Sequence, residues 1–107
     1  MEIHKILGRG FSEIVYKDAL EHEMKINAIA YEREKEFLIE YKNIVLPHKS
    51  YADFVAFNSL VIEVKVKKGI ADEHYTQTIN YLAVSKCKVG LIINFGEPSL
   101  IYKRIVL

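Results

Sequence analysis

Residues 51–66 constrain the fold more than any other stretch, because they predict two apolar strands joined by a tight turn at Asn58-Ser59. Three charged residues interrupt this apolar pattern: Asp53, Glu63 and Lys65. A buried charge without a partner is costly, and a purely structural hairpin would avoid all three or spread them over a wet face. The hairpin therefore predicts a functional site.

The register of the hairpin decides which of these charges meet. Side chains alternate along a strand, so Glu63 and Lys65 share one face. A two-residue turn at Asn58-Ser59 pairs Asp53 with Val64 and places it on the opposite face. A three-residue loop over residues 57–59, or a bulge, pairs Asp53 with Glu63. A metal site requires the second arrangement.

Length and composition indicate one ordinary globular domain, residues 1–107, in which 50% of the residues are hydrophobic and 27% are charged. No apolar run approaches the ~20 residues of a membrane span. The first residues lack the apolar stretch of a secretory signal, so we expect a cytoplasmic protein without membrane contact. The single cysteine, Cys87, excludes an internal disulfide.

Charge is unevenly distributed although the net charge is only +1. Residues 60–107 hold seven Lys/Arg against four Asp/Glu, a balance of +3. This excess indicates an anionic partner, with Lys67 as a candidate substrate contact. Lysine-rich strand edges also serve to prevent aggregation, so the structural explanation stays open.

Apolar residues at helical spacing predict two helices. The first begins after the N-cap residue Ser12 and runs to about Met24. Its expected core stripe consists of Phe11, Ile14, Val15 and Ala19, widened by Leu20 and Met24. The second helix spans residues 71–86 and carries His74 on its surface. Its expected core stripe consists of Tyr75, Thr78, Ile79 and Leu82.

Strands are expected at residues 37–41, in the two halves of the hairpin, at 89–95 and at 100–107. Residues 28–36 are ambiguous, Pro47 should end regular pairing, and residues 48–50 read as a loop. The strands flanking the second helix should lie parallel, and the first three strands can form an antiparallel meander. The predicted fold class is α/β, a mixed sheet flanked by helices.

Acidic residues on neighbouring strands, with a lysine two residues on, suit Mg²⁺ chemistry. Mg²⁺ prefers oxygen ligands and keeps several waters. A metal-bound water can attack a phosphodiester while the metal neutralises the developing charge. A nearby lysine can orient that water or stabilise the transition state.

Asp53, nine intervening residues and then Glu63-Val64-Lys65 resemble the signature of the PD-(D/E)xK nuclease superfamily. The element order also resembles the αβββαβ(β) restriction-endonuclease-like core. The resemblance implies that Asp53 and Glu63 bind Mg²⁺ or Mn²⁺ and that Lys65 assists the water. Ala52 stands where the family pattern has proline, a departure that removes no ligand.

Two further strings extend the resemblance. Residues 10–16 read G-x-x-E-x-x-Y and, with Arg33-Glu34 and Asn94-Phe95-Gly96, resemble the small GxxExxY family. This likeness implies that Glu13 approaches the metal. Gln77 and Tyr81 are similar to a Q-x-x-x-Y motif on the second helix of some nucleases, which implies support of the site or contact with nucleic acid.

The leading hypothesis is a metal-dependent nuclease acting on DNA or RNA. Its expected catalytic residues are Asp53, Glu63, Lys65 and Gln77, its metal ligands Glu13, Asp53 and Glu63, and its substrate contacts Tyr81 and Lys67. The alternative is a nuclease fold without turnover that binds nucleic acid or a protein. A homodimer is possible in either case, through the apolar end formed by Ile101, Ile105, Val106 and Leu107.

Overall fold

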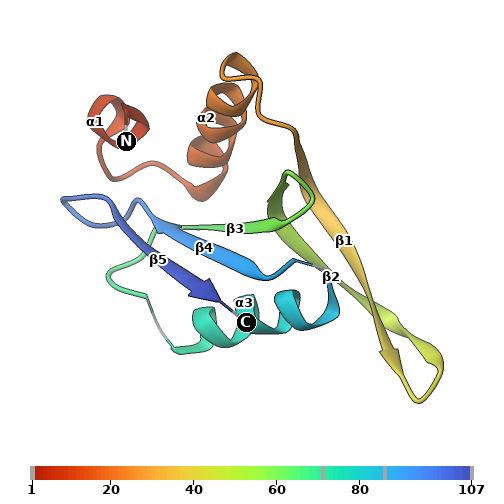
Figure 1. The fold of residues 1–107 in the computed structure, drawn as a ribbon. Coiled ribbons are helices and arrows are strands. Elements are labelled where there is room, and N and C mark those ends of the chain that lie inside the picture. Colours follow the sequence, from red (N-terminus) through yellow and green to blue (C-terminus); the bar gives the residue numbers. More distant parts are fainter. Residues whose placement is uncertain (1, 71, 86, 107) are drawn as a thin grey trace.

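A computed structural model describes residues 2–70, 72–85 and 87–106. It shows a five-stranded mixed sheet in the order β1-β2-β3-β4-β5, with helices on both faces (Figure 1). The helices are α1 (Glu2–Leu7), α2 (Glu13–Ile26) and α3 (Asp72–Val84). The strands are β1 (Tyr31–Tyr41), β2 (Ile44–Ala56), β3 (Leu60–Lys65), β4 (Val89–Asn94) and β5 (Ile101–Val106).

The topology confirms the predicted fold class, a mixed α/β sheet of the restriction-endonuclease-like type. Strands β1, β2 and β3 form an antiparallel meander. Strands β3 and β4 lie parallel on either side of α3 in the sequence, and β5 returns antiparallel to β4. Helix α1 was not predicted. In the described part of the chain, no helix has the length and apolar character needed to span a membrane.

One core lies between the sheet and α1 and α2. In α2 its buried residues are Tyr16, Leu20 and Met24, whereas Phe11 and Ile14 remain 50% and 55% exposed. Leu20 and Met24 of the predicted stripe are confirmed in the core, whereas Phe11 and Ile14 are not, because the buried face is rotated toward Tyr16. The Tyr16 ring explains the rotation, since it stacks on Phe95 at 4.5 Å between centroids and donates a 2.6 Å hydrogen bond to the Gly8 carbonyl.

A second core lies on the opposite face, under α3. It contains Val55 and Val61 from the sheet with Tyr81, Leu82 and Cys87. His74 is buried, so its predicted surface position was wrong, and Ile79 is exposed rather than part of the core. The predicted helix ends, Ala71 and Lys86, lie outside the described residues.

Strands β1 and β2 extend beyond the other strands as a projecting arm (Figure 1). The ambiguous residues from Tyr31 onward belong to β1. Strand β2 continues through Pro47, because the pairing shifts between Leu38 and Glu40 and accommodates the proline in an irregularity. The predicted loop at residues 48–50 was therefore wrong. Lys42 and Asn43, both with positive φ, turn the arm.

Candidate active site at the fork between β2 and β3

The hairpin has the three-residue loop that a shared site requires. Ala56 pairs with Leu60, and Phe57, Asn58 and Ser59 lie between them. This register continues to Phe54 opposite Ile62, so Asp53 comes next opposite Glu63. The structure thus confirms the odd-length loop, and side-chain alternation brings these two acids to one side of the hairpin.

The two strands part where the acids lie, since pairing between β2 and β3 ends at Phe54 and Ile62. The Asp53 carboxylate enters this fork. Its Oδ2 accepts a 2.7 Å hydrogen bond from the Val64 backbone N–H. Its Oδ1 lies 2.9 Å from the Lys17 ammonium of α2. Asp53 therefore replaces a main-chain acceptor and joins the sheet to the helix.

Glu63 is the most enclosed acid of the site, with 2% of its surface exposed. Its Oε1 has no hydrogen-bond partner among the described residues. Burial raises the pKa of Glu63 to about 9, reinforced by the charge of Asp53 and a hydrogen bond between the two carboxyls. The charge of Lys65 acts in the opposite direction. This environment favours the protonated form of Glu63, because it raises the pKa of that carboxyl.

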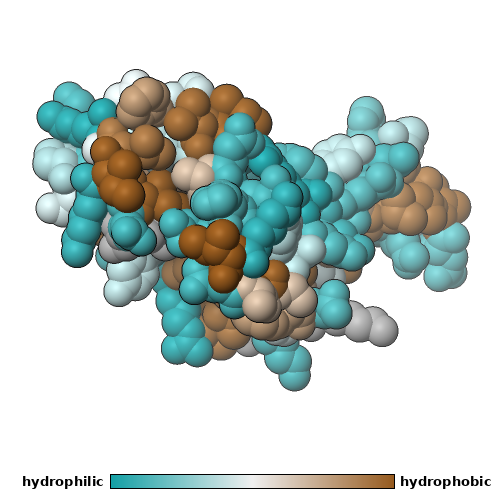
Figure 2. Space-filling model, turned by 90° about the horizontal axis from the view of Figure 1, so that it is seen from above, coloured by the Kyte–Doolittle hydropathy of each residue, from teal (hydrophilic) through white to brown (hydrophobic). Residues whose placement is uncertain are grey.

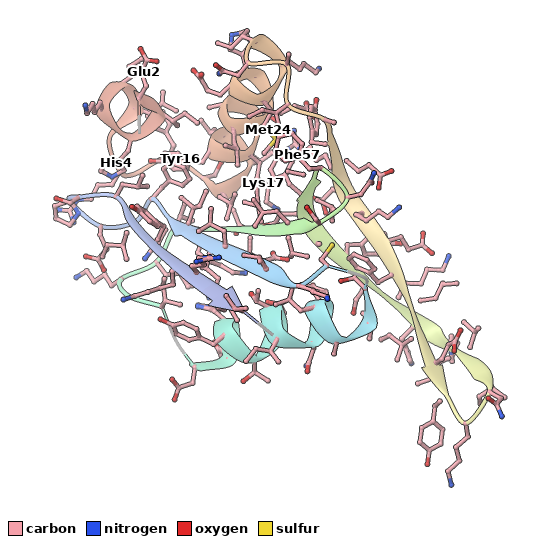
Figure 3. The ribbon with its side chains drawn as sticks, in the orientation of Figure 1. Glu2, His4, Tyr16, Lys17, Met24 and Phe57 are labelled. Atoms are coloured by element: carbon pink, nitrogen blue, oxygen red, sulfur yellow. The ribbon has the colours of Figure 1, made fainter. Side chains whose placement is uncertain are left out.

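Lys17 is a site residue that the sequence analysis missed. Its ammonium contacts Asp53 at 2.9 Å, Glu34 at 3.4 Å and Glu13 at 3.5 Å. Figure 3 shows Lys17 between α2 and the sheet. Burial alone lowers the pKa of Lys17, but its hydrogen bond to Asp53 and the three acidic charges raise it overall. The Glu-to-Lys spacing of four on α2 was the available signal.

Glu13 does not form a three-acid cluster with Asp53 and Glu63 among the described residues. Its carboxylate lies 3.5 Å from the Lys17 ammonium. Among the described residues, no three His, Cys, Asp or Glu side chains converge as a metal cluster. The structure therefore brings together two of the three predicted ligands. Glu34, which has φ of 52°, supplies a further carboxylate from β1.

Lys65 ends β3, and Lys67 follows two residues later. Lys65 is half-buried and forms no ion pair with a described residue. The charges of both lysines add to burial in lowering the pKa of His74 on α3, which places positive potential on this side of the site. Asn94 holds the Lys67 backbone, with Nδ2 donating to the Lys67 carbonyl at 2.7 Å and Oδ1 accepting from its N–H at 3.1 Å.

Gln77 and Tyr81 act as a pair on α3. The Gln77 amide Nε2 donates to the Tyr81 hydroxyl at 3.0 Å. Gln77 is exposed, whereas Tyr81 is buried beside the Phe37 ring. Burial raises the pKa of the Tyr81 phenol, and the charges of Glu63 and Asp53 add to this shift. Tyr81 therefore lies within electrostatic reach of both acids.

Comparison with known families decides the identity of the fold. The family model of the PD-(D/E)XK nuclease superfamily matches residues 1–105. The chain belongs to this superfamily. A search of curated proteins gives no match. Among solved structures, the one described as "Crystal structure of SSO0001" is similar, with a TM-score of 0.70 and 26% identity over 88% of this chain. The chain spans 50% of that solved chain.

The acids of this PD-(D/E)XK domain fit a divalent metal. Mg²⁺ in phosphate-processing sites is held by one or two carboxylates and keeps several waters, which matches Asp53 with Glu63. The unpartnered Oε1 of Glu63 is a buried oxygen that could coordinate a cation. Binding would also ionise Glu63, because a metal ligand must be deprotonated.

Proposed function

We propose that this PD-(D/E)XK domain is a metal-dependent nuclease that hydrolyses phosphodiester bonds of DNA or RNA. The observation that carries the proposal is the meeting of Asp53 and Glu63 at the fork, with Glu63 Oε1 buried and unpartnered. Burying such an acid pair costs free energy in a purely structural hairpin, whereas a bound cation would compensate its charge. The G-x-x-E-x-x-Y sequence motif around Glu13 further supports placing the chain in the GxxExxY group.

The roles follow from position and charge. When bound, Mg²⁺ or Mn²⁺ supplies an activated water and neutralises charge on the phosphate. Asp53 and Glu63 would hold the ion. Lys65, half-buried on the same strand face as Glu63, would orient the water and stabilise negative charge that develops on the phosphate. Lys67, exposed two residues beyond the end of β3, would contact the substrate backbone.

Gln77 and Tyr81 would act from α3. The exposed Gln77 amide holds the Tyr81 hydroxyl, so the pair would orient the site and present a polar edge to nucleic acid. Glu13 would act beside the metal rather than as a third ligand, because its carboxylate pairs with the Lys17 ammonium.

The direct test is cleavage of mixed DNA and RNA substrates with Mn²⁺ or Mg²⁺, comparing wild type with Asp53→Asn and Asp53→Ala. The amide oxygen of Asp53→Asn can still accept from the Val64 N–H, so this variant separates lost metal binding from lost folding. We expect both variants to lose at least about a hundredfold in rate, the scale of a removed electrostatic contribution. Glu2→Gln, an exposed acid on α1, is the matched control. Undiminished cleavage by Asp53→Asn would overturn the assignment.

A second candidate is a nuclease-fold module without turnover. The observation that favours it is Lys17, which satisfies Asp53 without any metal. Such a module could act as a homodimer through β5, where Val106 is 62% exposed, although Leu107 lies outside the described residues. A Mn²⁺ titration by calorimetry with no binding, together with a dimer by light scattering, would support it.

A further inference from the structure

Lys17 gathers three carboxylates from three elements of the fold. Glu13 lies one turn earlier on α2, Glu34 lies on β1, and Asp53 lies on β2. The Lys17 side chain is only 14% exposed and the Asp53 side chain 10%, so this contact is largely shielded from water. Its ammonium is a positive charge placed directly on a proposed metal ligand.

A divalent cation at Asp53 would meet this ammonium. Both need the same carboxylate oxygens, and two positive charges within a few ångströms repel strongly in a shielded site. The ammonium must therefore withdraw, or the metal must bind against its charge. Either course weakens metal binding relative to a site without Lys17.

The other two carboxylates offer the ammonium a place to withdraw to. The side chains of Glu13 and Glu34 are 39% and 50% exposed, so both lie nearer to water than Asp53. Glu34 adopts a left-handed φ of 52°, which is unusual for a residue with a side chain. That backbone conformation occurs where Glu34 reaches Lys17 at 3.4 Å.

We propose that Lys17 is a built-in competitor of the divalent metal, holding Asp53 in the metal-free protein and moving toward Glu13 and Glu34 when metal loads. This inference rests on the proposed metal site. It makes Lys17 a positioning residue that sets the metal concentration at which the site fills. It also gives the buried Asp53 carboxylate a counter-charge whenever no metal is bound.

The test compares Mn²⁺ binding by calorimetry, at one fixed pH, for wild type, Lys17→Met and Lys17→Gln. Methionine keeps the apolar stem without the charge, and glutamine can still donate to Asp53, so the second variant covers a folding failure of the first. We expect each neutral variant to bind Mn²⁺ about tenfold more tightly. Lys25→Met, an exposed lysine on the same helix, should bind as wild type does.

Thermal unfolding gives an independent readout. Without Mn²⁺, Lys17→Met should unfold at a lower temperature than wild type, because Asp53 loses its counter-charge. Saturating Mn²⁺ should raise the unfolding temperature more in the variant than in wild type. If Lys17 had a purely structural role, Lys17→Met would lower the unfolding temperature by the same amount with and without Mn²⁺.

The outcomes separate the two proposals. Equal Mn²⁺ affinity in wild type and both neutral variants would overturn the competition while leaving the metal site standing. Absence of Mn²⁺ binding in every variant would overturn the metal site itself and the competition with it. Weaker binding in the neutral variants would show that Lys17 assists the metal, contrary to the proposal.

Discussion

At the scale of single residues, Glu63 shows what burial does to an acid. Its pKa lies near 9 in the folded chain and near the ordinary value of 4.5 in the unfolded chain. Between pH 4.5 and pH 9, Glu63 holds a proton in the folded state that it has released in the unfolded state. The contribution of the Glu63 carboxyl to stability is therefore fully present below pH 4.5 and is lost as the pH rises toward 9.

Glu63→Gln should remove this dependence. The variant side chain is neutral at every pH. Its stability should match that of wild type in acid and should exceed it at higher pH, where only wild type loses this contribution. The divergence in the free energy of unfolding can reach at most about 1.4 kcal/mol per pH unit. Denaturant unfolding across the window measures it, with the exposed Glu2→Gln as control. Parallel curves for wild type and Glu63→Gln would contradict the assigned burial effect.

Sequence reasoning reached some of these residues and missed others for a physical reason. Strand alternation alone placed Glu63 and Lys65 on one face. The loop length then determined that Asp53 lies on the same face. Lys17 depends on the rotation of α2, which the stacking of Tyr16 on Phe95 fixes. That contact joins residues far apart in the chain, so local periodicity could not supply it.

At the scale of elements, the Phe57–Ser59 loop determines the register of the site. Phe57 and Asn58 both have positive φ, near 55°. Such a conformation costs a residue with a bulky side chain about 1 kcal/mol, whereas asparagine tolerates it better. Phe57 is 60% exposed, so its side chain gains little from burial in return.

Two substitutions in this loop should therefore act in opposite directions. Phe57→Asn should raise the free energy of unfolding by about 0.5–1 kcal/mol, and Asn58→Ala should lower it by a similar amount. Urea unfolding of the two variants measures both. Stabilisation by Asn58→Ala would contradict the left-handed loop.

The central elements were predictable because each carries a local signal. The first helix after Ser12, the hairpin and the parallel β3 and β4 strands all appear as expected. The full length of the arm was not predictable, because Pro47 indicates a break in the strand. Only the register shift on β2 explains why pairing continues past it. Helix α1 is short, and its burial of Ile3 depends on the completed sheet.

At the scale of the whole molecule, the end of the arm carries an apolar patch that the core does not cover. Figure 2 shows a hydrophobic patch over the projecting end of the molecule. Its exposed apolar residues at the turn are Tyr41, Ile44 and Val45, which are 54% to 57% exposed. Exposed apolar strands favour association between molecules.

Replacing Tyr41, Ile44 and Val45 together by threonine should reduce self-association with little effect on folding. Surface changes of this kind each alter stability by about 0.5 kcal/mol or less. Light scattering against concentration measures association, and denaturant unfolding measures stability. Val61→Thr, fully buried, should destabilise by about 1–3 kcal/mol and serves as the contrast. A large loss of stability in the arm variant would show that the arm belongs to the core.

The hydrogen bond from Val64 to Asp53 has a spectroscopic consequence. An amide proton bonded to an ionised carboxylate at 2.7 Å, inside a buried fork, should exchange slowly with solvent and resonate downfield. Its nuclear magnetic resonance signal would thus respond when Asp53 changes its partner. One backbone signal could follow the filling of the site in an intact molecule, without any substrate or cleavage product.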